Sequence, residues 1–249
     1  MLVEYKVKKY LVKVFNKAIS PLGVKLVRSR SNLLNNFNDI FVKDRLSNWI
    51  VNLNNLSALS QNIRGMIDER TGEELFALTY MQALSGDVAE IGSFQGKSTF
   101  FLGNAVKLSG NGKLYAIDHF RGNLGKENFY VVGKSDLSDL ESGFISNIKK
   151  AQLEDSVTLI NKPNDEAVSE IEDSSLRLLY IDGDHTEDGV YKDLQLFKKK
   201  LKSSAIIIFD DYDNVGFPGV VKVVNNFCES FKIRRKYLIE RTLVIELAP

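Results

Sequence analysis

Residues 88–103, VAEIGSFQGKSTFFLG, contain the pattern that decides the fold. A short apolar run over Asp87–Ile91 predicts a strand, because runs of this length suit a strand covered on both faces. Gly92 and Gly96 then permit a tight turn, since glycine adopts backbone conformations that other residues avoid. The apolar spacing that follows predicts a helix over residues 97–108. A strand that turns directly into a helix is the unit from which parallel sheets are built.

Lys97 and Ser98 give this turn the letters of a phosphate-binding loop, G-x-x-x-x-G-K-[ST]. Only three residues separate Gly92 from Gly96, so the ring of amides that wraps a phosphate is one residue short. A zwitterionic ligand fits better, because Glu90 attracts a positive group while the amides at the helix start attract a carboxylate. S-adenosylmethionine carries both an amino acid end and a sulfonium. The alternative is a plain glycine-rich turn without a ligand.

Short apolar runs alternate with longer helical stretches through the rest of the chain. Strands are expected at Asp87–Ile91, Lys113–Ile117, Ser156–Ile160, Leu176–Ile181, Ala205–Phe209, Ile233–Ile239 and Thr242–Leu247. Helices are expected at 97–108, 139–151, 164–172 and 187–201. A capping box of Thr71 and Glu74 predicts a further helix over Thr71–Leu84. The pattern predicts an α/β fold: a Rossmann-like, seven-stranded, mostly parallel sheet with helices on both faces and a C-terminal antiparallel hairpin.

The N-terminal part of the chain differs from the remainder. Residues 1–64 are expected to form a helical extension, and residues 65–249 the main domain. Residues 2–19 place apolar side chains on one helical stripe, and residues 1–30 carry eight basic side chains against one acidic. One interpretation lays this basic helix on an anionic membrane, at its inner face. The favoured interpretation packs its apolar stripe on the domain or on a second subunit of a homo-oligomer.

Composition narrows the class of protein. The chain has 249 residues, a net charge of +1, one cysteine and two histidines. A single cysteine excludes an intrachain disulfide framework and favours a reducing, cytoplasmic compartment. The Cys and His counts also exclude a zinc cluster of these residues, so any metal is expected to be a hard ion held by oxygen ligands. Beyond residue 30 acidic side chains outnumber basic ones, so no nucleic-acid partner is expected.

Acidic side chains lie at the ends of four predicted strands: Glu90, Asp118, Asp182, and Asp210 with Asp211. Ligands bind beyond the carboxyl ends of the strands in an open parallel sheet, so we expect these acids to line one site. Asp118 is placed to accept hydrogen bonds from ribose hydroxyls. If the last two of these strands are neighbours, three carboxylates converge. Their repulsion would raise their pKa values unless a divalent cation neutralised them.

Four segments of the chain occur in the order typical of class I S-adenosylmethionine-dependent methyltransferases. They are VAEIGSFQGKSTFFLG, LYAIDHF, LLYIDGDHTEDGVYKDL and AIIIFDDY, and the resemblance covers about residues 65–249. More narrowly, they resemble the branch that contains macrolide-sugar and aminocoumarin-sugar O-methyltransferases and cephalosporin-hydroxylase-like proteins. The resemblance implies an O-methyltransferase that uses S-adenosyl-L-methionine and Mg²⁺, or another hard divalent cation. Its small-molecule acceptor would be a hydroxyl of a sugar or glycan.

Two alternatives to this activity stay open from the sequence. One is a metal-dependent enzyme of the same fold with different, hydroxylase-like chemistry, because one fold hosts many reactions. The other is a nucleotide-binding module without catalysis, in which the acids serve only the structure.

The resemblance also assigns roles within the cofactor site. The methionine part of the cofactor is expected at the glycine turn, formed by Glu90, Gly92, Ser93, Gly96 and Ser98. Asp118 would bind the ribose, and His119 would lie near the adenine.

The same resemblance assigns the catalytic residues. Asp182, Asp210 and Asp211 would bind the metal ion. His185 is a candidate general base because its ordinary pKa suits proton transfer near neutrality. The alternative is that His185 orients Asp182 or caps the helix that follows, and that metal-bound Asp182 takes the proton.

Overall fold

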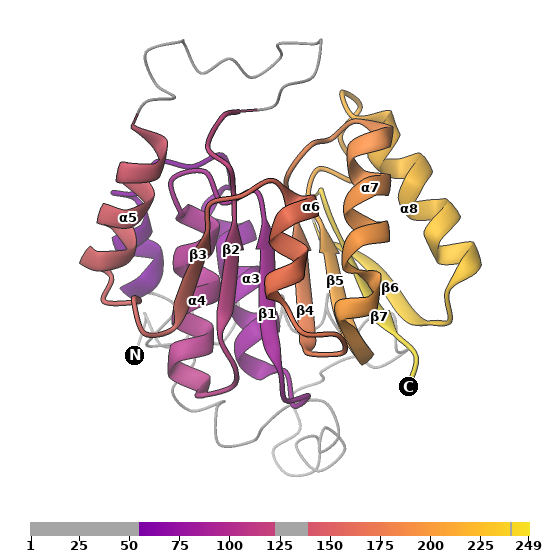
Figure 1. The fold of residues 1–249 in the computed structure, drawn as a ribbon, viewed down its shortest axis with the longest axis horizontal. Helices are drawn as coiled ribbons and strands as arrows, with labels where there is room; N and C mark the ends of the chain where they lie inside the picture. Colours follow the sequence, from indigo (N-terminus) through magenta and orange to yellow (C-terminus); the bar gives the residue numbers. More distant parts are fainter. Residues whose placement is uncertain (1–54, 123–138, 240) are drawn as a thin grey trace, which may run out of the picture.

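The computed structural model describes residues 55–122, 139–239 and 241–249. Its centre is a seven-stranded sheet with the strand order β3-β2-β1-β4-β5-β7-β6 (Figure 1). The strands are β1 (Asp87–Ile91), β2 (Leu114–Ile117), β3 (Val157–Ile160), β4 (Leu176–Ile181), β5 (Leu201–Phe209), β6 (Ile233–Ile239) and β7 (Thr242–Leu247). β1 to β5 are parallel, and β7 runs antiparallel to both β5 and β6. The predicted fold class and hairpin are confirmed.

Helices cover both faces of the sheet (Figure 1). They are α3 (Glu69–Met81), α4 (Lys97–Ser109), α5 (Leu140–Lys150), α6 (Asn164–Ala167), α7 (Glu187–Phe197) and α8 (Pro218–Ser230). One buried cluster joins α3, α4 and α5 to one face, and a second joins α6, α7 and α8 to the other. The neighbouring strand residues Val88 and Ala89 belong to different clusters, as expected where side chains alternate along a strand.

Three predictions about the helices are wrong in detail. The capping box does not form: Asp68 is the N-cap of α3, and its carboxylate accepts from the backbone N–H of Thr71 at 2.7 Å. The helix expected over 187–201 ends at Phe197, because a 3-10 turn and the early start of β5 at Leu201 follow. α8 was not expected from the sequence.

The described part of the N-terminal region packs on the domain. Residues 55–60 are helical, and Leu56 and Ile63 belong to the same buried cluster as α3. The predicted basic helix at residues 2–19 lies outside the described residues, so its membrane or subunit contact stays a prediction. Within the described residues, every helix is too short or too polar to cross a membrane.

The strand order fixes where a ligand can bind. β1 lies between β2 and β4, so the chain leaves β1 toward one edge of the sheet and later returns to its other side. Such a reversal opens a crevice at the carboxyl ends of the central strands, where open α/β sheets bind their ligands. In this chain the glycine turn follows β1, and the acidic segments follow β2, β4 and β5.

Candidate active site

A cavity of about 680 Å³ lies at the carboxyl ends of the central strands. Nine of the predicted site residues line it: Gly92, Ser93, Ser98, Asp118, His119, Asp182, His185, Asp210 and Asp211. Glu90 and Gly96 do not line it. The structure therefore places the predicted metal ligands and most of the predicted cofactor residues around one cavity.

The glycine turn lies against the end of β4. Gly92 has a φ of 86°, and a Cβ there would come within 2.1 Å of the Asp182 carbonyl oxygen. Gly96 also has a φ of 86°, and it caps the start of α4. A side chain at Gly92 would separate the turn from the acidic segment, so glycine is required for the close approach of the two.

Glu90 does not line the cavity, but it holds the glycine turn through hydrogen bonds. Its side chain is fully buried, and Oε2 accepts hydrogen bonds from Ser93 Oγ at 3.1 Å and Thr99 Oγ1 at 2.5 Å. Among the described residues, Oε1 has no hydrogen-bond partner. Burial raises the pKa of Glu90 to about 7, although the hydroxyl donors oppose this shift. Its predicted contact with the cofactor stays a prediction.

Asp118 is fixed by backbone amides. Its Oδ2 accepts from the N–H groups of Ser93 and Phe94 at 3.0 and 2.8 Å, and its Oδ1 accepts from Phe120 at 2.7 Å. A carboxylate offers about four acceptor positions, so a ribose hydroxyl could still be accepted. Next to it, His119 Nδ1 accepts from the backbone N–H of Arg121 at 3.0 Å.

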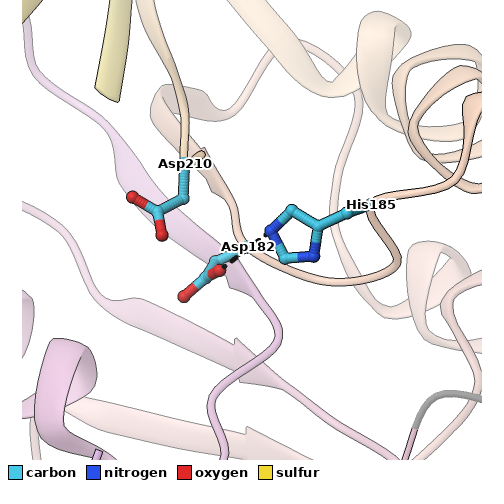
Figure 2. A group of neighbouring side chains, drawn as sticks. All are labelled: Asp182, His185 and Asp210. Atoms are coloured by element: carbon cyan, nitrogen blue, oxygen red, sulfur yellow. Dashed lines mark ion pairs between the residues drawn. The ribbon is translucent and has the colours of Figure 1, made fainter. Parts of the chain in front are cut away.

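Asp182, His185 and Asp210 converge in the same cavity. One potential ligand atom from each lies within 4.8 Å of those of the other two (Figure 2). Asp182 follows β4 and Asp210 follows β5, and these strands pair in register up to Ile181 and Phe209. The neighbouring strands therefore bring two carboxylates together, as the sequence predicts.

Two hydroxyls orient these carboxylates. Tyr180 donates to Asp182 Oδ2 at 3.3 Å, and Thr242 Oγ1 donates to Asp210 Oδ1 at 3.0 Å. Burial and the charge of Asp210 raise the pKa of Asp182 well above its ordinary value. Burial and the charge of Asp211 raise the pKa of Asp210 in the same way. The repulsion expected between the strand-end acids is thus present, and a cation would relieve it.

His185 lies between the aspartates and an aromatic ring. Its Nε2 is 3.5 Å from Asp182 Oδ1 and 3.7 Å from Asp211 Oδ2, and its ring stacks on Phe217 at 4.5 Å. Nε2 is buried and has no hydrogen-bond partner among the described residues. Burial lowers the pKa of His185, but the facing aspartates outweigh burial and raise it above its ordinary value.

Asp211 points partly away from the other acids. Its Oδ1 accepts from Asn214 Nδ2 at 3.0 Å and lies 3.5 Å from Arg241 Nη1. Its backbone is left-handed, with a φ of 51°. The tightest group therefore contains His185 where the sequence predicts Asp211, and the role of Asp211 as a metal ligand stays a prediction.

Sequence reasoning did not find the residues that hold the site in place. Thr99 lies within the predicted helix next to the glycine turn, and a hydroxyl nine residues after Glu90 is a weak local signal. Tyr180 lies only two residues before Asp182, but its apolar strand hides its role, and the contact of Thr242 with Asp210 spans 32 residues and leaves no local signal. Phe217 is a further such residue, because its ring packs on the ring of His185.

The family of methyltransferase domains matches residues 89–212, from the glycine turn to the acidic pair. The chain belongs to this family. The expectation of a class I S-adenosylmethionine-dependent methyltransferase is thereby confirmed. The matched segment contains all the predicted acidic site residues, Glu90, Asp118, Asp182, Asp210 and Asp211.

Solved structures share the fold of this methyltransferase. A SAH-bound methyltransferase from Podospora anserina, PaMTH1, is 13% identical with a TM-score of 0.57, over 91% of this chain and 100% of that one. An O-methyltransferase from Bacillus cereus in complex with SAH is 16% identical with a TM-score of 0.55, over 81% and 90%. The O-methyltransferase NovP is 16% identical with a TM-score of 0.55, over 80% and 81%. At these identities the similarity concerns the fold.

Proposed function

We propose that this methyltransferase moves the methyl group of S-adenosylmethionine to a hydroxyl oxygen of a sugar or glycan, and that Mg²⁺ or another hard divalent cation assists it. The observation that carries the proposal is the convergence of Asp182, His185 and Asp210 in the cavity that also contains the glycine turn. The names of two structures with the same fold, both O-methyltransferases, support oxygen as the acceptor atom. The sequence resemblance to sugar O-methyltransferases supports a sugar acceptor.

The residues present fit a hard cation. Asp182 and Asp210 offer oxygen ligands whose pKa values are raised by burial and by a neighbouring aspartate, Asp210 in the first case and Asp211 in the second. His185 Nε2 lies next to the same carboxylates, 3.5 Å from Asp182 and 3.7 Å from Asp211. A bound cation would acidify the acceptor hydroxyl and hold it in line with the sulfonium methyl group.

The side chains of this chain would supply orientation and proton transfer. Tyr180 and Thr242 hold the two carboxylates, and Phe217 restricts the His185 ring. The acceptor hydroxyl must lose its proton, and His185 Nε2 is the nearest base to the acids. Asp182 remains the alternative base. The glycine turn and Asp118, which line the same cavity, would position the methyl donor.

The proposal is tested by binding and turnover in parallel. Calorimetry should show that S-adenosylmethionine binds with or without Mg²⁺, and mass spectrometry should show a gain of one methyl group on members of a panel of sugars and glycans. Chelation should abolish turnover while leaving cofactor binding mostly intact. Undiminished transfer in the presence of chelator would contradict the metal role. Tight ATP binding without S-adenosylmethionine binding would restore the phosphate-loop interpretation.

A further inference from the structure

Arg241 places a positive charge beside the acidic residues of the cavity. Among the described residues that line the cavity, only Arg241 and Lys97 carry a permanent positive charge. Lys97 begins α4, directly after the glycine turn. Arg241 directly precedes β7, and its Nη1 lies 3.5 Å from Asp211 Oδ1. Arg241 is therefore the cation next to the predicted metal ligands, and the proposed chemistry does not use it.

The backbone around Arg241 is fixed to the segment after β5. The carbonyl oxygen of Arg241 accepts from the backbone N–H of Asp213 at 3.2 Å. The next residue, Thr242, is buried and donates to Asp210 Oδ1 at 3.0 Å. The side chain of Arg241, by contrast, is 62% exposed. The fold therefore holds the base of this side chain beside the acids and leaves the guanidinium accessible to a ligand.

The guanidinium is not needed to hold Asp211 in place. Asp211 Oδ1 already accepts a hydrogen bond from Asn214 Nδ2 at 3.0 Å. The contact with Arg241 is an ion pair without a hydrogen bond, and exposed ion pairs add little stability. In the part of the chain that the structure describes, no hydrogen bond engages the guanidinium. Its N–H groups therefore remain available to a ligand.

The charge of Arg241 favours an anionic ligand. It does not favour the metal ion, because a positive charge beside a cation site repels the cation. A guanidinium holds a carboxylate through two parallel hydrogen bonds. A phosphate group carries nearly two negative charges at neutral pH, and Asp210 and Asp211 would repel it more strongly. The single charge of a carboxylate is the better match for one arginine among aspartates.

We infer that Arg241 selects acceptors whose sugar carries a carboxylate, namely uronic acids and glycans that contain them. The acceptor hydroxyl would lie at Asp182 and His185, and the carboxylate of the same sugar at Arg241. Only the Asp211 carboxylate separates the two groups, at 3.5 Å from Arg241 Nη1 and 3.7 Å from His185 Nε2, so one sugar can contact both. This inference rests on the proposed methyl transfer to a sugar or glycan.

The test measures methyl transfer to matched pairs of acceptors, with saturating S-adenosylmethionine and Mg²⁺. Methyl glycosides and short oligomers of glucuronic and galacturonic acid are each compared with the carboxyl-reduced compound, in which CH₂OH replaces the carboxylate. The wild-type kcat/KM should be about tenfold or more higher for the acid, the scale of a hydrogen bond between charged groups. Arg241→Gln should bring the two values within about threefold. The loss should appear mainly in KM, because the carboxylate does not react.

Arg234→Gln is the matched control. Arg234 is also partly exposed and pairs with Glu246 at 2.8 Å, but it does not line the cavity, so this change should leave the preference at the wild-type value.

Three results would overturn the inference. If Arg241 only supported Asp211, Arg241→Gln would lower kcat for both members of each pair and keep their ratio. A wild-type protein that methylates the neutral compounds as well as the acids, or that prefers glucose 6-phosphate to the glucuronide, would overturn the inference and leave the proposed function intact. Transfer to none of these sugars would overturn both.

Discussion

The two ends of β4 both bury charged groups, but only one end satisfies them. At the amino end, Arg177 is fully buried and donates to the carbonyl oxygens of Gly86, Thr79 and Asn111 and to the side chain of Gln82, at 2.8 to 3.1 Å. Gln82 Nε2 donates in return to the Arg177 carbonyl oxygen at 2.8 Å. This network joins α3, β1 and β4.

At the carboxyl end, the charges oppose one another. Asp182 faces Asp210, and the neighbouring His185 Nε2 is buried without a hydrogen-bond partner among the described residues. Buried polar groups normally find partners, so each exception needs an explanation. We infer that the two ends have different roles. The amino end of β4 stabilises the fold, and the charged groups at its carboxyl end bind ligands.

Breaking the amino end should have the largest effect. Arg177→Met removes the donor for two buried and two partly buried oxygens, and a buried acceptor left unsatisfied costs about 1–3 kcal/mol, so we expect a loss of roughly 5 kcal/mol in the free energy of unfolding. Urea denaturation measures this loss. Lys202→Met is the control, because Lys202 is only partly buried and its hydrogen bond to the Ser85 carbonyl oxygen, at 2.7 Å, is exposed.

A milder variant covers the case in which Arg177→Met does not fold. Gln82→Leu removes only the exchange between Gln82 and Arg177 and should cost about 1–3 kcal/mol. If both variants were as stable as Lys202→Met, the amino end would not be the stabilising region.

Changing the carboxyl end should affect turnover and not stability. Asp182→Asn removes a predicted metal ligand, so we expect kcat to fall by roughly 10³-fold, about 4 kcal/mol in the activation free energy. The free energy of unfolding should stay equal or rise, because a neutral amide no longer repels Asp210. Asp173→Asn, at an exposed aspartate that pairs with Lys200, controls for loss of charge elsewhere. An unfolded Asp182→Asn variant would contradict the division between the two ends.

The sequence predicted most of this arrangement because its signals are local. Seven apolar runs marked the strands, and the acids lie directly after them in the chain. α8 was missed because Pro218–Ser230 is rich in valine and asparagine, which are poor helix formers. Packing overrides that propensity: Val220, Val223, Val224 and Phe227 fall on one buried helical face.

Contacts between distant segments could not be predicted in the same way. Nothing near Arg177 in the chain indicates a network with Thr79 and Gln82, which are almost 100 residues away. The hydrogen bond from Thr242 to Asp210 likewise joins two segments that are distant in the sequence. Chain segments that meet only after folding leave no periodic pattern in either segment.

Glu90 of β1 pairs with Tyr180 near the carboxyl end of β4, so its titration offers a test of this region by pH. Its folded pKa of about 7 lies above the ordinary 4.5, so its contribution to stability is complete below about pH 4.5 and is lost as the pH rises through 7. Glu90→Gln cannot ionise and should be roughly 3 kcal/mol more stable than wild type at pH 8, with little difference near pH 4.5. Urea denaturation across this range measures the difference.

The same variant should bind S-adenosylmethionine more weakly. Loss of the Glu90 charge removes attraction for a positive ligand group, and we expect about a tenfold lower affinity, the scale of a hydrogen bond to a charged group. If the free energy of unfolding changed with pH in the same way in wild type and Glu90→Gln, the raised pKa of Glu90 would be contradicted.

The His185 variant distinguishes the two roles proposed for this histidine. His185→Ala should lower kcat by about 10²-fold, roughly 2.7 kcal/mol, the usual contribution of a general base. If His185 is the base, the acidic limb of the wild-type kcat profile follows its titration, because the base must lose its proton, and the facing aspartates shift that limb to a pH above the ordinary pKa of histidine. That limb should vanish in His185→Ala. The other histidine of the chain supplies the control: His119→Ala should keep the limb, since His119 directly follows Asp118, the predicted ribose ligand. An unchanged limb in His185→Ala would mean that the histidine only orients Asp182, and Asp182 would then be the base.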